Sequence, residues 1–149
     1  MSIKSQKENM RRLAALLSHD LGYIEGDREC GPNGDKRVFL NVGKTFLRAL
    51  GKDLGLRDVK VTSNADGIAV SGACTLIGMW EDSGIYICIE QPCFMRENVL
   101  LFRTVRHMKD YRGGHNNFIS RRELDRMSYE ELLSRLLSTR KELRVERAA

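Results

Sequence analysis

The spacing of apolar residues predicts helices near both ends of the chain and strands between them. Apolar residues recur at helical intervals over residues 4–21 and 42–54, and a glycine typical of a helix end follows each segment. A third helix is expected over residues 129–146, because Ser128 and Glu131 have the spacing of a capping box. The pattern therefore predicts two N-terminal helices and one C-terminal helix.

Between residues 57 and 106 the apolar residues recur at every second position instead. Ile85, Ile87 and Ile89 share one face of a predicted strand, and more polar residues alternate with them. Short turn-forming segments divide this region into four strands. We therefore expect an α+β fold: an antiparallel four-stranded meander with the two N-terminal helices and the C-terminal helix packed on it.

The start of the second helix depends on how the preceding segment is interpreted. Residues 25–37 contain three glycines and a proline, which favour a long turn. The apolar segments that flank it, residues 23–24 and 38–40, are consistent with a short hairpin. Asn41 then follows as the expected cap of the helix over residues 42–54.

Length and composition indicate one domain over residues 1–149. The chain is 42% apolar and 30% charged, which is sufficient for a hydrophobic core and unlike a disordered chain. No apolar run approaches the ~20 residues that a membrane helix needs. The N-terminus is polar and lacks the apolar region of a signal peptide, so we expect a cytoplasmic protein.

The net charge of +5 is unevenly distributed along the chain. Residues 1–50 carry nine basic and six acidic side chains, residues 51–99 carry four and seven, and residues 100–149 carry twelve and seven. An acidic middle between basic ends favours an anionic partner for the basic parts. A well-mixed, solvated surface remains the alternative.

The densest basic segment surrounds the predicted loop over residues 107–119. Arginine and lysine bind phosphates or acidic protein surfaces, tyrosine can stack on a base or anchor an interface, and Gly113-Gly114 permits a close backbone approach or a positive φ. Three basic residues on one face of the second helix form a further stripe. The expected partner-binding residues are Arg103, Arg106, Lys109, Tyr111, Arg112, His115, Asn116 and Asn117 in the loop region, and Lys44, Arg48 and Lys52 in the stripe.

The sequence contains no complete catalytic motif. Cys88, Cys93, His107 and His115 could form a Cys-His pair or a zinc site, but the chain lacks the C-x2-C pairs of typical zinc sites. Nucleotide-binding glycine motifs are also missing. We therefore expect that the protein is not an enzyme, has no catalytic residue and binds no cofactor or metal. A zinc-stabilised interaction domain is the alternative.

Three segments resemble domains carried by bacterial mobile genetic elements. Residues 39–56 (FLNVGKTFLRALGKDLGL), 67–72 (GIAVSG) and 111–117 (YRGGHNN) are similar to the large polyvalent protein-associated domains of conjugative elements and phages. The resemblance extends over about half of the chain from Phe39 to Phe118. It implies a small accessory protein, either an inhibitor of host defence nucleases, a class that includes anti-CRISPR proteins, or a DNA-handling factor.

These observations predict a non-enzymatic binding protein of a mobile genetic element. The specific expectation is an anti-CRISPR-like inhibitor, with Cas9 as the first target, that occupies a protein or guide-RNA surface. The expected partner is the host nuclease or its ribonucleoprotein complex. A DNA- or RNA-binding accessory module is the alternative, and the sequence gives no oligomeric state.

Overall fold

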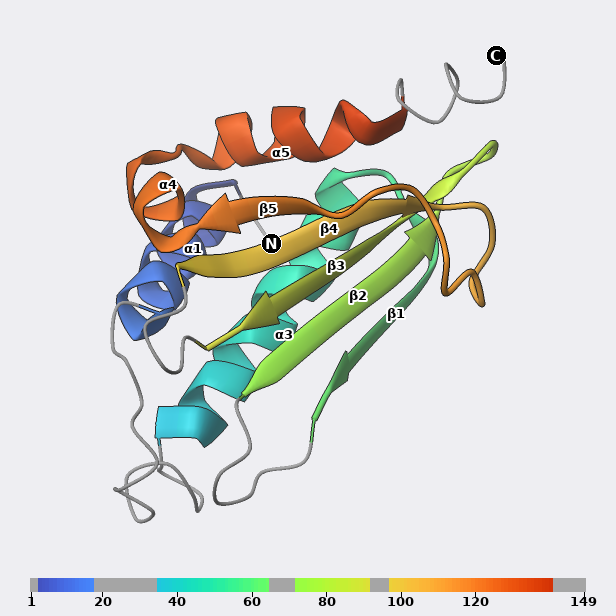
Figure 1. Ribbon diagram of the computed structural model, residues 1–149. Coiled ribbons are helices and arrows are strands. Elements are labelled where there is room, and N and C mark those ends of the chain that lie inside the picture. Colours follow the sequence, from blue (N-terminus) through green and yellow to red (C-terminus); the bar gives the residue numbers. More distant parts are fainter. Residues whose placement is uncertain (1–2, 18–34, 65–71, 92–96, 141–149) are drawn as a thin grey trace.

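A single five-stranded antiparallel sheet forms the centre of the fold. The computed structural model in Figure 1 describes residues 3–17, 35–64, 72–91 and 97–140. The strands lie in the sheet in the order of the sequence, so each pairs with the next along the chain. They are β1 (Arg57–Ser63), β2 (Ala73–Met79), β3 (Gly84–Glu90), β4 (Asn98–Val105) and β5 (Asn117–Ser120).

The described helices form a layer on one face of this sheet. They are α1 (Ile3–Leu17), α3 (Asp35–Asp53), α4 (Arg121–Arg126) and α5 (Tyr129–Leu137). α3 packs on β1 and β2 behind the sheet in Figure 1, and α1 packs against α3. α4 follows β5 directly, and α5 extends along that edge. None of the described helices has the length and apolar character needed to cross a membrane.

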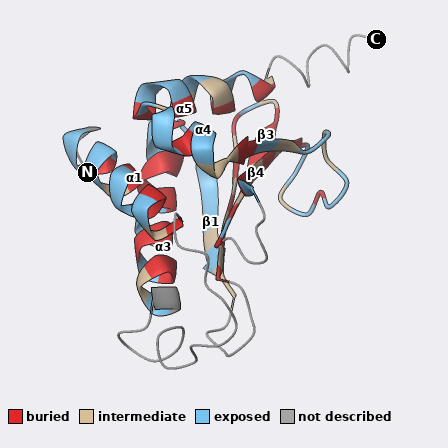
Figure 2. Cartoon of the chain, turned by 60° about the vertical axis from the view of Figure 1, so that its left-hand side comes forward, coloured by how far each residue is buried: buried red, intermediate tan, exposed pale blue. Residues whose placement is uncertain are grey.

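Alternation along the strands creates the core, as the sequence predicts. Ile85, Ile87 and Ile89 are completely buried, whereas the residues between them are only partly buried. Phe39 and Phe46 from α3 complete the same core, and Figure 2 shows buried residues on the inner side of the helices. Burial of one such side chain contributes roughly 1.5–3 kcal/mol relative to exposure. The contact between sheet and helix layer therefore holds the fold together.

The end of α3 was predicted correctly and its beginning was not. Gly55 has φ +71°, the N–H of Leu56 donates to Gly51 O at 3.0 Å, and the N–H of Gly55 donates to Lys52 O at 3.0 Å. This is the expected Schellman ending. However, α3 begins at Asp35 rather than at residue 42.

Residues 38–40 were expected in a hairpin strand but are helical. Phe39 lies on the same buried face as Phe46 and Leu50, at spacings of seven and eleven residues, so burial against the sheet extends the helix in this direction. Asn41 is consequently inside the helix and does not cap it. The other predicted half of the hairpin, residues 23–24, lies outside the described residues, as do residues 18–21 of the first predicted helix.

The C-terminal part also differs from the prediction, because it contains a fifth strand and an additional helix. Ser120 begins α4 with a reciprocal capping box: Ser120 Oγ accepts from the N–H of Glu123, and Glu123 Oε1 accepts from the N–H of Ser120, both at 3.1 Å. Ser128 caps α5 as expected and accepts from the N–H of Glu131 at 3.1 Å. The last predicted residues of this helix, 141–146, are outside the described part of the chain.

Candidate partner-binding surface

The loop that joins β4 to β5 is organised around a buried carboxylate, that of Asp110. Its Oδ2 atom accepts hydrogen bonds from the backbone N–H of Arg106 at 2.9 Å and from Arg106 Nε at 3.2 Å. Its Oδ1 atom accepts from the N–H groups of Arg112 at 3.1 Å and Gly113 at 2.9 Å. The Asp110 side chain is only 3% exposed. Three backbone N–H donors thus fix the backbone on both sides of this residue, and the Arg106 side chain adds a fourth hydrogen bond.

These hydrogen bonds also determine the pKa of Asp110. Burial by itself raises the pKa of a carboxylic acid, because it penalises the charged form. The donors from Arg106, Gly113 and Arg112 outweigh burial and hold the pKa of Asp110 well below its usual range. The carboxylate is therefore charged at neutral pH, and it offsets one of the positive charges of the loop.

Close contact with β4 further fixes the loop. A Cβ atom on Gly113 would lie 2.2 Å from Thr104 O, and one on Gly114 would lie 2.2 Å from Thr104 Oγ1. The N–H of Gly114 donates to Thr104 O at 2.9 Å. The Gly-Gly pair thus allows the loop backbone to lie close to β4 of the same chain, and its expected part in binding a partner stays a prediction.

Besides Arg106, two of the expected partner-binding residues make internal contacts that support the loop. Arg103 Nη1 donates to Asp110 O at 3.0 Å, and its guanidinium group lies over the ring of Tyr86, 4.9 Å from the ring centre. Asn117 lies in β5, where its Nδ2 donates to Phe102 O and to His115 O, each at 3.4 Å. Both residues connect the loop to the sheet.

The remaining predicted residues of the loop face the solvent. Tyr111 is 86% exposed, the largest exposure among the described large hydrophobic residues. Arg106 is exposed along most of its side chain although its Nε atom contacts Asp110. We define the tip surface as the exposed side chains of Lys109, Tyr111, Arg112, His115 and Asn116. It presents cations and an aromatic ring on a loop whose backbone is fixed by hydrogen bonds to the buried Asp110 carboxylate.

The basic stripe on α3 is a separate patch. Arg48 and Lys52 are exposed and Lys44 is half-buried, so the residues lie along a helix face as the spacing predicts. In Figure 1, α3 lies behind the sheet while the loop after β4 extends from the end of the strands, and in Figure 2 α3 stands to the left of the sheet. A partner that contacts only a small area of the protein therefore cannot bind the stripe and the tip surface together.

The cysteines and histidines do not come together in the described part of the chain. Cys88 lies within β3 and pairs with Leu101, whereas His107 follows the far end of β4 and His115 is in the loop. Burial raises the pKa of Cys88 to about 11 and that of Cys74 to about 12. Among the described residues, no three His, Cys, Asp or Glu side chains are grouped as metal ligands. Cys30 and Cys93 lie outside them.

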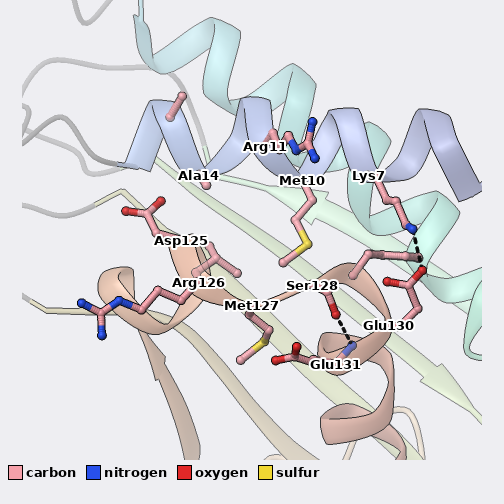
Figure 3. Close-up of a pocket in the computed structure, with 13 residues that line it drawn as sticks. Lys7, Met10, Arg11, Ala14, Asp125, Arg126, Met127, Ser128, Glu130 and Glu131 are labelled. Atoms are coloured by element: carbon pink, nitrogen blue, oxygen red, sulfur yellow. Dashed lines mark hydrogen bonds and ion pairs between the residues drawn. The ribbon is translucent and has the colours of Figure 1, made fainter.

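A pocket that the sequence did not predict separates α1 from the junction of α4 and α5 (Figure 3). Its volume is about 590 Å³, and Met10 and Met127 both line it. Lys7 Nζ pairs with Glu130 Oε1 at 2.7 Å on its wall. Arg11 and Arg126 add positive charge, while Asp125 and Glu131 add negative charge, so the lining favours neither an anion nor a cation.

Sequence interpretation missed the role of Asp110 and of its neighbours Thr104 and Tyr86. An aspartate among four basic residues has the appearance of one more surface charge. The signal that identifies it is the spacing Asp110-x-x-Gly113, because an aspartate often accepts from the N–H groups two and three residues later in a turn.

Comparison of the chain with family models, with curated proteins and with solved structures gives no match.

Proposed function

We propose that this chain is a non-enzymatic binding protein that occupies the surface of a partner through its tip surface. The observation that supports this most strongly is the exposure of Tyr111, at 86%, between Lys109 and Arg112 on a loop fixed by Asp110. A large exposed aromatic side chain next to cations is typical of the residues that dominate binding energy in interfaces. A preformed loop also loses little conformational entropy when it binds.

The absence of an assembled catalytic pair among the described residues favours this assignment. A cysteine nucleophile needs a lowered thiol pKa and a nearby base. Cys74 and Cys88 have raised pKa values, and β-sheet register separates Cys88 from His107. These two thiols are therefore protonated at neutral pH and suited to packing.

The specific function that we propose is inhibition of a host defence nuclease, anti-CRISPR-like, with Cas9 or its guide-RNA complex as the first target. The support comes from the resemblance of residues 39–56, 67–72 and 111–117 to domains of mobile genetic elements. The last of these segments includes Tyr111 and Arg112 of the tip surface. The cations of this surface complement an acidic protein surface or exposed guide RNA.

A cleavage assay tests this function. Cas9 loaded with guide RNA is incubated with increasing amounts of the protein before addition of a target DNA. We expect cleavage to stop at a stoichiometric amount of wild-type protein. The variant K109E/Y111A/R112E should lose inhibition, since it reverses both cations and removes the aromatic ring. It leaves Arg103, Arg106 and Asp110 in place, so the contacts that hold the loop are retained.

A matched variant controls for charge alone. K4E/R12E reverses two exposed cations on α1, distant in sequence from the loop, and should inhibit like wild type. A second variant, R48E/K52E, tests the α3 stripe separately. Full cleavage in the presence of excess wild-type protein would refute Cas9 as the target. Equal inhibition by the wild-type protein and K109E/Y111A/R112E would refute the tip surface as the site.

A further inference from the structure

The face of the sheet opposite the helices is open in the described part of the protein. Side chains on this face form two rows across the strands. One row contains Thr62, Thr75, Cys88, Leu101 and Phe118, and the other contains Lys60, Ile77, Tyr86 and Arg103. Figure 1 is viewed from this side, with α3 behind the sheet. No described helix packs on it.

This open face is more apolar than contact with water alone requires. An antiparallel sheet with one solvated face usually presents polar residues there. Here Ile77, Tyr86 and Leu101 are only half-buried, and Phe118 is 44% exposed. A contiguous apolar patch on a protein surface is typical of an interaction site.

Cations lie at one edge, in the centre and beyond one end of this apolar patch, whereas Glu90 is exposed at the opposite end, and the cations outnumber it. Lys60 is exposed at the β1 edge, and Arg103 lies over Tyr86 in the centre. Lys109 and Arg112 follow beyond the end of β4. A second copy of this chain would bring two such basic faces together in a molecule with a net charge of +5, which is unfavourable. The ligand should therefore be anionic and also have flat apolar parts.

The same face contains a small hollow. It has a volume of about 90 Å³, with Cys88, Leu101 and Phe118 as apolar lining and Glu90 and Asn98 as polar lining. A base can stack on the exposed Phe118 ring, since stacking on aromatic side chains contributes in single-strand recognition. Carboxylate and amide groups at the rim are the types that accept from or donate to base edges.

We infer that the open sheet face binds single-stranded nucleic acid. One base stacks on Phe118, a neighbouring base contacts the Tyr86–Arg103 stack, and Lys60, Lys109 and Arg112 neutralise phosphates. The five strands span ~19 Å at a spacing of ~4.8 Å, and sheets of similar width in RNA-binding modules accommodate two or three bases. This site goes beyond the protein inhibition proposed above, and its core residues Phe118 and Tyr86 are outside the tip surface.

Fluorescence anisotropy tests this inference with the full-length protein. The probes are labelled 12-nucleotide DNA and RNA single strands of mixed sequence and the matching DNA duplex, in ~50 mM salt, where phosphate contacts are strong. We expect saturable binding of a single strand with at least tenfold preference over the duplex. The DNA and RNA probes show which sugar is preferred. Phe118→Ala should weaken binding about tenfold, because it removes one stacked base.

Leu137→Ala is the matched control, since Leu137 on α5 is 38% exposed and lies away from the open face. It should bind like wild type, and both variants should show wild-type circular dichroism. The inference is overturned if no single strand binds, if the duplex binds equally well, or if Phe118→Ala binds like wild type. Loss of a protein partner in Phe118→Ala, without any oligonucleotide binding, would instead identify a protein interface and also overturn it. Inhibition of Cas9 by K109E/Y111A/R112E is measured independently, so either proposal can fail alone.

Discussion

The guanidinium group of Arg103 lies 4.9 Å from the centre of the Tyr86 ring. Because Arg103 also donates to Asp110 O at 3.0 Å, this one side chain connects the open face of the sheet to the loop after β4. The arrangement explains why a residue expected to bind a partner is itself held in the structure. Arg103 therefore supports both proposed surfaces, which share Lys109 and Arg112.

Replacing Arg103 by lysine is expected to destabilise the protein although the charge is retained. Lysine lacks the planar group that stacks on Tyr86 while it donates to the Asp110 carbonyl. The free energy of unfolding should fall by about 1 kcal/mol, as expected for loss of a partly exposed cation–π contact. Urea denaturation measures this change. Arg112→Lys is the control, because an exposed substitution of this kind should change stability by less than about 0.5 kcal/mol.

Asp110→Asn should cost more, about 2 kcal/mol. The substitution preserves shape, but an amide NH₂ group then faces N–H donors that the carboxylate accepted, and buried donors lose their partners. Denaturation of the purified variant provides the measurement. Asp125→Asn, at an exposed position of α4, should unfold like wild type. Equal stability of Asp110→Asn and wild type would show that the loop does not depend on this carboxylate.

The contribution of Asp110 should also depend on pH. Its folded-state pKa is depressed, so its stabilisation is complete above the unfolded-state value of about 3.9 and is lost as the pH falls towards the folded-state value. The difference in unfolding free energy between wild type and Asp110→Asn should therefore be constant from about pH 7 to 5 and decrease below about pH 4. A difference that is unchanged at pH 3 would contradict the assigned cause.

Cys74 and Cys88 should react slowly with thiol reagents in the native protein. Burial raises their pKa values from 9.0 to about 12 and about 11, and each unit lowers the reactive thiolate fraction tenfold. At pH 8, Cys88 should alkylate about a hundredfold more slowly in the folded protein than in urea, as followed by mass spectrometry of its peptide. Similar rates in both conditions would show that these thiols are accessible.

Most of the sheet could be predicted from the sequence, because a strand with one buried face leaves a period of two. Ile85, Ile87 and Ile89 illustrate this. β5 could not be found in the same way, since only Ile119 in it is buried and its pairing with β4 is a long-range contact. The predicted start of α3 was wrong for a related reason. Residues 38–40 have local preferences that suit a strand, but packing of Phe39 against the sheet favours the helix.

The composition of the sequence located the candidate surface, but the contacts inside the loop could not be predicted from it. The sequence identifies basic and aromatic residues near residue 110, and Tyr111 is indeed exposed. It does not distinguish Arg103, which contacts Tyr86, from Arg112, whose side chain faces solvent. That distinction depends on which side chains reach Asp110 and Tyr86 once the strands are paired.

A pull-down of tagged protein from bacterial lysate tests the central claim, binding of a partner through the tip surface, most directly. Wild type and K109E/Y111A/R112E are compared with and without nuclease digestion, and bound proteins are identified by mass spectrometry. We expect wild type to capture a stoichiometric nuclease that survives digestion, and the variant to capture none. Equal capture by the variant, or recovery of nucleic acid alone, would contradict the claim.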